Sequence, residues 1–100
     1  MTAATITDLE ALVAEKEAAY KAAAERLAPL RTVQAEQEYV NSHYAACLAV
    51  ARSQGVLLNG PATFQAARES YRELVEMARE VYDEALKELT RARVALWHAA

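Results

Sequence analysis

His43 and Cys47 are the residues of this chain whose types and spacing come closest to catalytic chemistry. Residues four apart share one face of a helix, so the two side chains could form a nucleophile and its base, or half of a metal site. A nucleophile pair also needs an orienting group and an oxyanion pocket, and the neighbouring sequence supplies neither. We therefore interpret Cys47 as a small buried thiol beside a histidine at the edge of the core. The sequence predicts no catalytic residues and indicates that the protein is not an enzyme.

The glutamates near His43 raise the separate question of a metal site. Di-iron sites in helical bundles use inward-facing Glu-x-x-His pairs. The residue three before His43 is Val40, and the residue three before His98 is Ala95, so this motif is absent. A single cysteine allows neither an internal disulfide nor a multi-cysteine zinc site. The sequence therefore predicts no metal site and no cofactor.

Charge and hydropathy exclude several classes of partner. The chain has 100 residues and a net charge of −3, with a sequence pI near 5.4. Nucleic-acid binding needs a basic patch that displaces counterions, and no uncharged apolar run reaches the roughly 18 residues of a membrane span. Residues 1–5 show no basic region followed by an apolar run, as a signal peptide would. We expect no nucleic acid, no membrane and a cytoplasmic location in a bacterium or host cell, with secretion without a signal peptide left open.

Apolar periodicity and two interruptions divide the chain into three helical segments within one domain. The predicted elements are helices over about residues 7–28, 29–53 and 63–98, with a loop over about 54–62. Thr7 to Glu10 fits a capping box for the first helix, and Gly55 suits the left-handed cap of the second. The apolar stripe turns by roughly 130° at Pro29. We expect a sharp kink or a true turn there, with Pro29 at the first position of the second segment.

The last segment has the widest apolar face, which covers an arc of about 180°. That arc is wider than the seam of a two-stranded coiled coil and is typical of a bundle of three or four helices. Alanine supplies nearly half of the 54% hydrophobic residues and buries little area, and self-association is the usual remedy for a small core. We therefore predict an all-α fold: an extended antiparallel helical hairpin, kinked or broken at Pro29, whose three-segment bundle is completed in a homodimer.

Val56, Leu57 and Leu58 form the most suggestive segment for binding. Three consecutive large apolar residues in a connecting loop are unfavourable in water, so they either plug the end of the bundle or contact a partner or a second copy. Loops carry binding roles more often than packed helices do. Tyr39 lies toward the edge of the preceding segment, and tyrosine is common at interfaces. We predict a protein-interaction role for these four residues.

These features favour a non-enzymatic helical protein–protein interaction module. It would act as a small adaptor or inhibitor that occupies a surface of another protein, whose identity the sequence does not reveal. A composition rich in alanine, with arginine preferred over lysine, is typical of bacteria with GC-rich genomes and of their phages.

The alternative is a secreted or chaperone-like helical hairpin. In length and in its two long arms the chain resembles the WXG100 secretion substrates, but the motifs of that family are missing. The loop reads Val56 to Gly60 without Trp-x-Gly. Tyr71 and Tyr82 are followed four residues later by Val75 and Leu86, where the family has an acidic residue.

Overall fold

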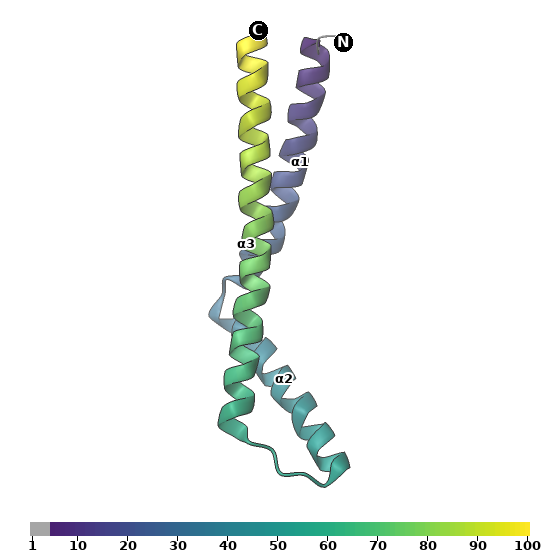
Figure 1. Cartoon of the computed structure of the whole chain (residues 1–100), viewed down its shortest axis with the longest axis vertical. Helices are drawn as coiled ribbons and strands as arrows, with labels where there is room; N and C mark the ends of the chain where they lie inside the picture. Colours follow the sequence, from purple (N-terminus) through teal and green to yellow (C-terminus); the bar gives the residue numbers. More distant parts are fainter. Residues whose placement is uncertain (1–4) are drawn as a thin grey trace. The chain divides into compact units, whose positions relative to one another are not determined.

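The computed structural model describes residues 5–100. That range contains three helices, α1 (Ile6–Leu30), α2 (Val33–Gln54) and α3 (Gly60–Ala99) (Figure 1). Helix accounts for 91% of the structure, and no strand occurs among these residues. The all-α prediction and the predicted order of the elements are therefore confirmed.

α1 begins two residues earlier than a cap at Thr7 would allow, because Thr5 is the cap. The Thr5 hydroxyl accepts a hydrogen bond from the Asp8 backbone N–H at 3.1 Å, and the Asp8 carboxylate accepts one from the Thr5 N–H at 3.2 Å. This reciprocal pair is a capping box, which satisfies amides that have no partner within the helix. The predicted box from Thr7 to Glu10 is wrong, because Thr7 already lies inside the helix.

The first helix ends at Leu30, and α2 begins at Val33 after a tight two-residue break. Thr32 caps α2, since its hydroxyl accepts from the Ala35 N–H at 3.1 Å and donates to the Pro29 carbonyl at 3.3 Å. The Leu30 carbonyl accepts a hydrogen bond from the Tyr71 hydroxyl. The ends of both helices are thus satisfied by side chains that meet at the break.

The structure has a true break rather than a kink, and it corrects the predicted position of Pro29. Pro29 lies in the last turn of α1, and not at the first position of the second helix. Proline removes one backbone hydrogen bond and its ring clashes with the preceding turn, and α1 ends one residue later, at Leu30. The signal for the start of α2 was Thr32, a capping residue directly before the apolar Val33.

Caps also define the loop between α2 and α3. Gly55 adopts the left-handed conformation with φ of 66°, and the Val56 N–H donates to the Ala51 carbonyl at 2.9 Å, as in a Schellman motif. The Asn59 side-chain oxygen accepts from the Ala62 N–H at 3.1 Å and starts α3. Gly55 was predicted correctly, and the loop between the helices is shorter than expected.

The helices form two compact units, which combine different parts of the chain. The first contains the chain up to Leu27 together with Ala78–Ala100, and the second is Ala28–Met77. α3 contributes residues 60–77, its first half, to the second unit and residues 78–99, its slightly longer second half, to the first.

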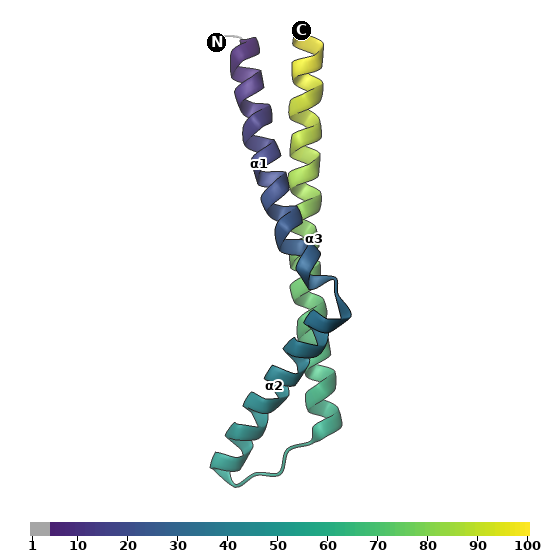
Figure 2. The same cartoon turned by 180° about the vertical axis from the view of Figure 1, so that it is seen from behind.

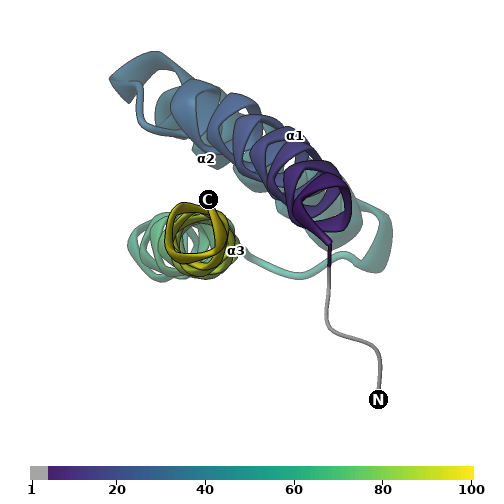
Figure 3. The same ribbon diagram turned by 90° about the horizontal axis from the view of Figure 1, so that it is seen from above.

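In the first unit, α1 lies antiparallel to the second half of α3, as Figures 1 and 2 show from opposite sides. Figure 3 looks nearly along α3 and shows α1 inclined to it. The buried side chains are small or aliphatic: Ala23 and Leu27 of α1, and Ala85, Leu89 and Ala92 of α3. Alanines allow the helices to approach closely but contribute little apolar area, so this core is thin.

Polar contacts flank that core. The hydroxyls of Tyr20 and Tyr82 are hydrogen-bonded at 2.9 Å, with ring centroids 5.2 Å apart. Lys16 forms an ion pair with Glu88 at 3.0 Å. These contacts join α1 to α3 at two positions along the helices and fix their antiparallel register.

In the second unit, α2 packs against the first half of α3 and inclines away from it toward the loop (Figures 1 and 2). Aromatic pairs connect the helices: the Tyr39 and Tyr71 centroids are 5.3 Å apart, and the Tyr44 and Phe64 rings stack at 4.4 Å. Tyr71 is buried, and burial together with the nearby Glu36 carboxylate raises its pKa.

The two threonines at the start of α1 provide a test of the capping box. Thr5→Ala removes the capping oxygen and should lower the free energy of unfolding by about 0.5–2 kcal/mol. Thr7→Ala is the matched control and should change it by less than about 0.5 kcal/mol. Urea denaturation followed by circular dichroism measures both values. A larger loss for Thr7→Ala would contradict the observed cap.

Tyr71 should make the protein sensitive to alkaline pH. Its raised pKa means that the folded state holds the hydroxyl proton more tightly than the unfolded chain, whose tyrosine titrates near 10.0. This contribution to stability is fully present below that value and is lost as the pH rises through the raised pKa. The free energy of unfolding should therefore decrease more steeply above pH 10 in the wild type than in Tyr71→Phe. Equal slopes for the two proteins would contradict this assignment.

Candidate functional site

The loop and the end of α2 line an apolar cavity of about 400 Å³ that is open to solvent. We call this the loop-end surface. Ten residues line it: His43, Ala46, Cys47, Val50, Ala51, Gln54, Val56, Leu57, Leu58 and Asn59. None of them is Asp, Glu, Lys or Arg, although a quarter of the chain is charged. The lining therefore favours an apolar, uncharged contact.

The three loop residues predicted for binding are brought together at this surface, but they differ in burial. Leu57 is 99% exposed and Val56 is more than half exposed, while Leu58 is half-buried. The interpretation of the loop as a plug is wrong for Leu57, whose side chain covers no part of the core. An exposed leucine beside an apolar cavity and the exposed Val50 forms a patch that is typical of a contact site.

Tyr39 does not belong to the loop-end surface. Its ring packs against Tyr71 and stacks on His43 at a centroid distance of 6.3 Å, and it does not line the cavity. Because Tyr39 is half-buried between α2 and α3, its evident physical role is to join the two helices.

His43 and Cys47 both line the loop-end cavity, yet the structure does not complete a chemical site around them. Within residues 5–100 there is no group of three or more His, Cys, Asp or Glu side chains that could hold a metal ion. Cys47 is a half-buried free thiol. In this surrounding the two residues contribute to the apolar wall of the cavity.

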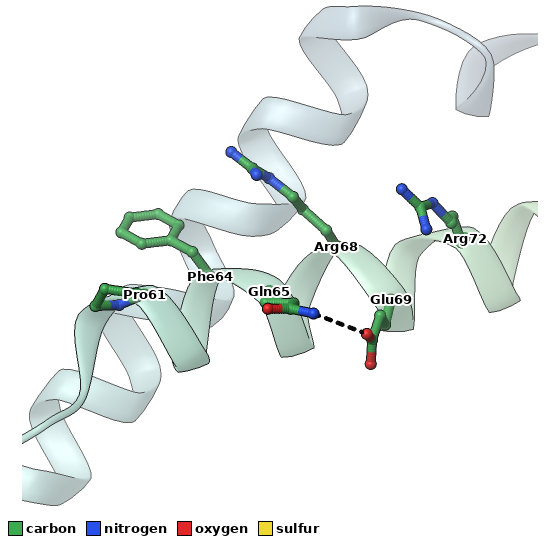
Figure 4. Close-up of a pocket in the computed structure, with 6 residues that line it drawn as sticks. All are labelled: Pro61, Phe64, Gln65, Arg68, Glu69 and Arg72. Carbon is green, nitrogen blue, oxygen red and sulfur yellow. Dashed lines mark hydrogen bonds between the residues drawn. The ribbon is translucent and has the colours of Figure 1, made fainter.

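A second surface lies along α3, and sequence reasoning missed it. A cavity of about 560 Å³ is lined by Pro61, Phe64, Gln65, Arg68, Glu69 and Arg72. Figure 4 shows Arg68 and Arg72 on the same side of the helix, with Glu69 on another side, where Gln65 donates to its carboxylate at 3.5 Å.

A neighbouring cavity extends this surface onto α2. It has a volume of about 340 Å³ and shares Phe64 and Arg68 with the first; its other lining residues are Val33, Glu36, Gln37, Val40 and Asn41. We call the two cavities together the arginine groove. Its signal in the sequence was an aromatic residue followed by two arginines at intervals of four, which places all three on one side of a helix.

The first unit leaves large apolar side chains of α3 in solvent. Val81, Leu86, Val94 and Trp97 are all exposed, and Trp97 is 76% exposed. At helical spacing Val81 lies on one side of the buried face marked by Leu89, and Leu86 and Trp97 lie on the other, so a single packed helix covers only part of the apolar arc.

Comparison with known proteins finds no match to this chain among protein-family models, curated proteins or solved structures. None of the helices of residues 5–100 is long and apolar enough to cross a membrane. The chemistry of the surfaces is therefore the basis for a functional proposal.

Proposed function

We propose that this chain is a non-enzymatic helical module that binds another protein through the loop-end surface. The observation that supports this most directly is Leu57, a leucine left 99% exposed beside an apolar cavity. Burial of such a side chain in a complex gains about 1.5–3 kcal/mol. Because no charged residue lines the cavity, binding there does not require a charged group of this chain to be removed from water.

The proposed module acts as a homodimer. Leu86 and Trp97, which lie on the same side of α3, would pack against a second copy and widen the thin core of the first unit into a bundle of more helices. Such completion is the usual way in which a small alanine-rich core gains sufficient buried area.

The proposed role is that of a small adaptor or inhibitor in the cytoplasm of a bacterium or of a cell infected by its phage. Such a protein works by occupying a surface, which requires a rigid helical support and an exposed apolar contact. The second candidate, a secreted or chaperone-like hairpin, is favoured by the length of the chain and by its pair of antiparallel arms alone.

Replacement of Leu57 tests the binding role. Leu57→Gln should leave the free energy of unfolding within about 0.5 kcal/mol of wild type, because the side chain is exposed. It should weaken binding of the purified partner by about ten- to a hundredfold. The partner is first isolated from the source cell with the tagged wild-type protein, and affinities are then measured by calorimetry.

Met77→Gln is the matched control, since Met77 is an exposed apolar residue of α3 outside the loop-end surface. It should retain the affinity of wild type. If Leu57→Gln binds the partner as tightly as the wild type, the loop is not part of the contact. If the variant loses much of its free energy of unfolding, Leu57 contributes to the core rather than to binding.

Light scattering tests the homodimer. At micromolar concentration the wild type should have twice the mass of the 11.0 kDa monomer, and its melting temperature should rise with concentration. The double variant Leu86→Gln with Trp97→Gln should shift the mass to the monomer, whereas Leu57→Gln should not. A wild-type mass of one chain at all concentrations would contradict the proposal.

A further inference from the structure

We propose that the arginine groove binds an acidic peptide segment of another protein. The segment that fits carries two carboxylates about one helical turn apart and an adjoining apolar side chain. The groove shares no lining residue with the loop-end surface, so this proposal does not depend on the role of Leu57.

The two arginines supply the charge that selects the ligand. Arg68 and Arg72 are four residues apart on α3, which separates them by about 6 Å along the helix axis, and they extend from the same side (Figure 4). The ion pairs formed within residues 5–100 are Lys16–Glu88 and Glu17–Arg93, and no hydrogen bond of either groove arginine is found there. Two neighbouring guanidinium groups repel each other, and carboxylates bound to both would remove this repulsion.

The two carboxylates that line the groove do not take this place. Glu69 extends away from both arginines and accepts a hydrogen bond from Gln65 (Figure 4). Glu36 lines the part of the groove on α2. The burial of Tyr71 is the main cause of that residue's raised pKa, and the negative charge of Glu36 adds to it. Glu36 forms no ion pair within 4 Å with either arginine in the described chain. The acid-binding end of the groove is therefore the strip of α3 that carries Arg68 and Arg72.

An apolar wall stands beside the arginines. Val33 of α2 is 80% exposed and lines the same cavity as Phe64 and the buried Val40. Phe64 is held in place because its ring stacks on Tyr44 with an interplanar angle of 10°. A wall that is already ordered costs less conformational entropy on binding. The groove thus combines a preformed apolar side with a cationic edge.

These properties favour a peptide with spaced carboxylates over a nucleic acid. Guanidinium groups bind carboxylates in a bidentate manner, and glutamates at positions i and i+4 of a helix have the same spacing as Arg68 and Arg72. A long polyanion would extend beyond the groove over a chain with a net charge of −3, which opposes its binding.

The test is a titration of the isotope-labelled full chain, followed by nuclear magnetic resonance. The probe is a synthetic helical peptide with glutamates at i and i+4 and leucines on the adjoining face. The matched peptide has glutamines in place of the glutamates. We expect saturable shifts of Val33, Phe64, Arg68 and Arg72 below about 1 mM peptide, and binding at least about tenfold weaker for the glutamine peptide. Added salt should weaken binding, because it screens exposed charges.

Variants of the exposed arginines complete the experiment. Arg68→Gln with Arg72→Gln should lose binding at least about tenfold with an unchanged circular dichroism spectrum. The pair of Arg→Lys replacements should retain part of it, and Arg91→Gln, at an exposed position of α3 outside the groove, should retain all of it.

Four results would overturn the proposal. They are the absence of saturable binding, equal binding by the double Arg→Gln variant, stronger binding of single-stranded oligothymidylate than of the acidic peptide, and conversion of a wild-type dimer to a monomer by the double variant. The last two would identify a nucleic acid or a second copy as the occupant.

Discussion

Where α1 ends, its last carbonyl groups lose their helical partners, and the contacts that satisfy them join the end of α1 to α2 and α3 within the second unit. The Ala28 carbonyl accepts from the Arg31 N–H, the Pro29 carbonyl from the Thr32 hydroxyl, and the Leu30 carbonyl from the Tyr71 hydroxyl. Ala28 and Pro29 are exposed, whereas the hydrogen bond to Leu30 is partly buried. Because buried backbone groups without partners are unfavourable, the Leu30 carbonyl is the one that depends most on its donor. Because Tyr71 belongs to α3 and its ring packs on Tyr39 of α2, one side chain contacts both the end of α1 and the first half of α2.

The small size of the buried side chains has a second consequence. Each unit has a core made largely of alanine with a few larger residues such as Leu89, which is 1% exposed. Such a core leaves many large apolar side chains of the same helices in water. Exposed apolar residues are normal when scattered, but here several gather beside a cavity, as Val50, Val56 and Leu57 do. The thin core and the proposed contact surfaces are therefore two results of one composition.

The two surfaces of the second unit differ in the chemistry that they offer. The loop-end surface has no charged residue in its lining, and Leu57 gives it an exposed apolar contact. The arginine groove combines Val33 and Phe64 with Arg68 and Arg72. An uncharged patch contributes affinity through burial, whereas a charged edge contributes selection among partners. A module that carries both could recognise one partner by shape and another by charge.

The sequence by itself determined the helical class, the Gly55 cap and the membership of Val56, Leu57 and Leu58 in the loop, because these depend on local periodicity and on glycine. It left a kink and a true turn near Pro29 both open. The residue that caps the start of α2 is Thr32, and the prediction that Pro29 starts it is wrong. Only the tertiary structure decided that Leu57 stays in solvent, that Tyr39 packs on Tyr71, and that Val33 lies beside Phe64 and Arg68. Exposure and neighbourhood depend on which faces of distant segments meet, and the spacing of residues along one segment contains no information about that.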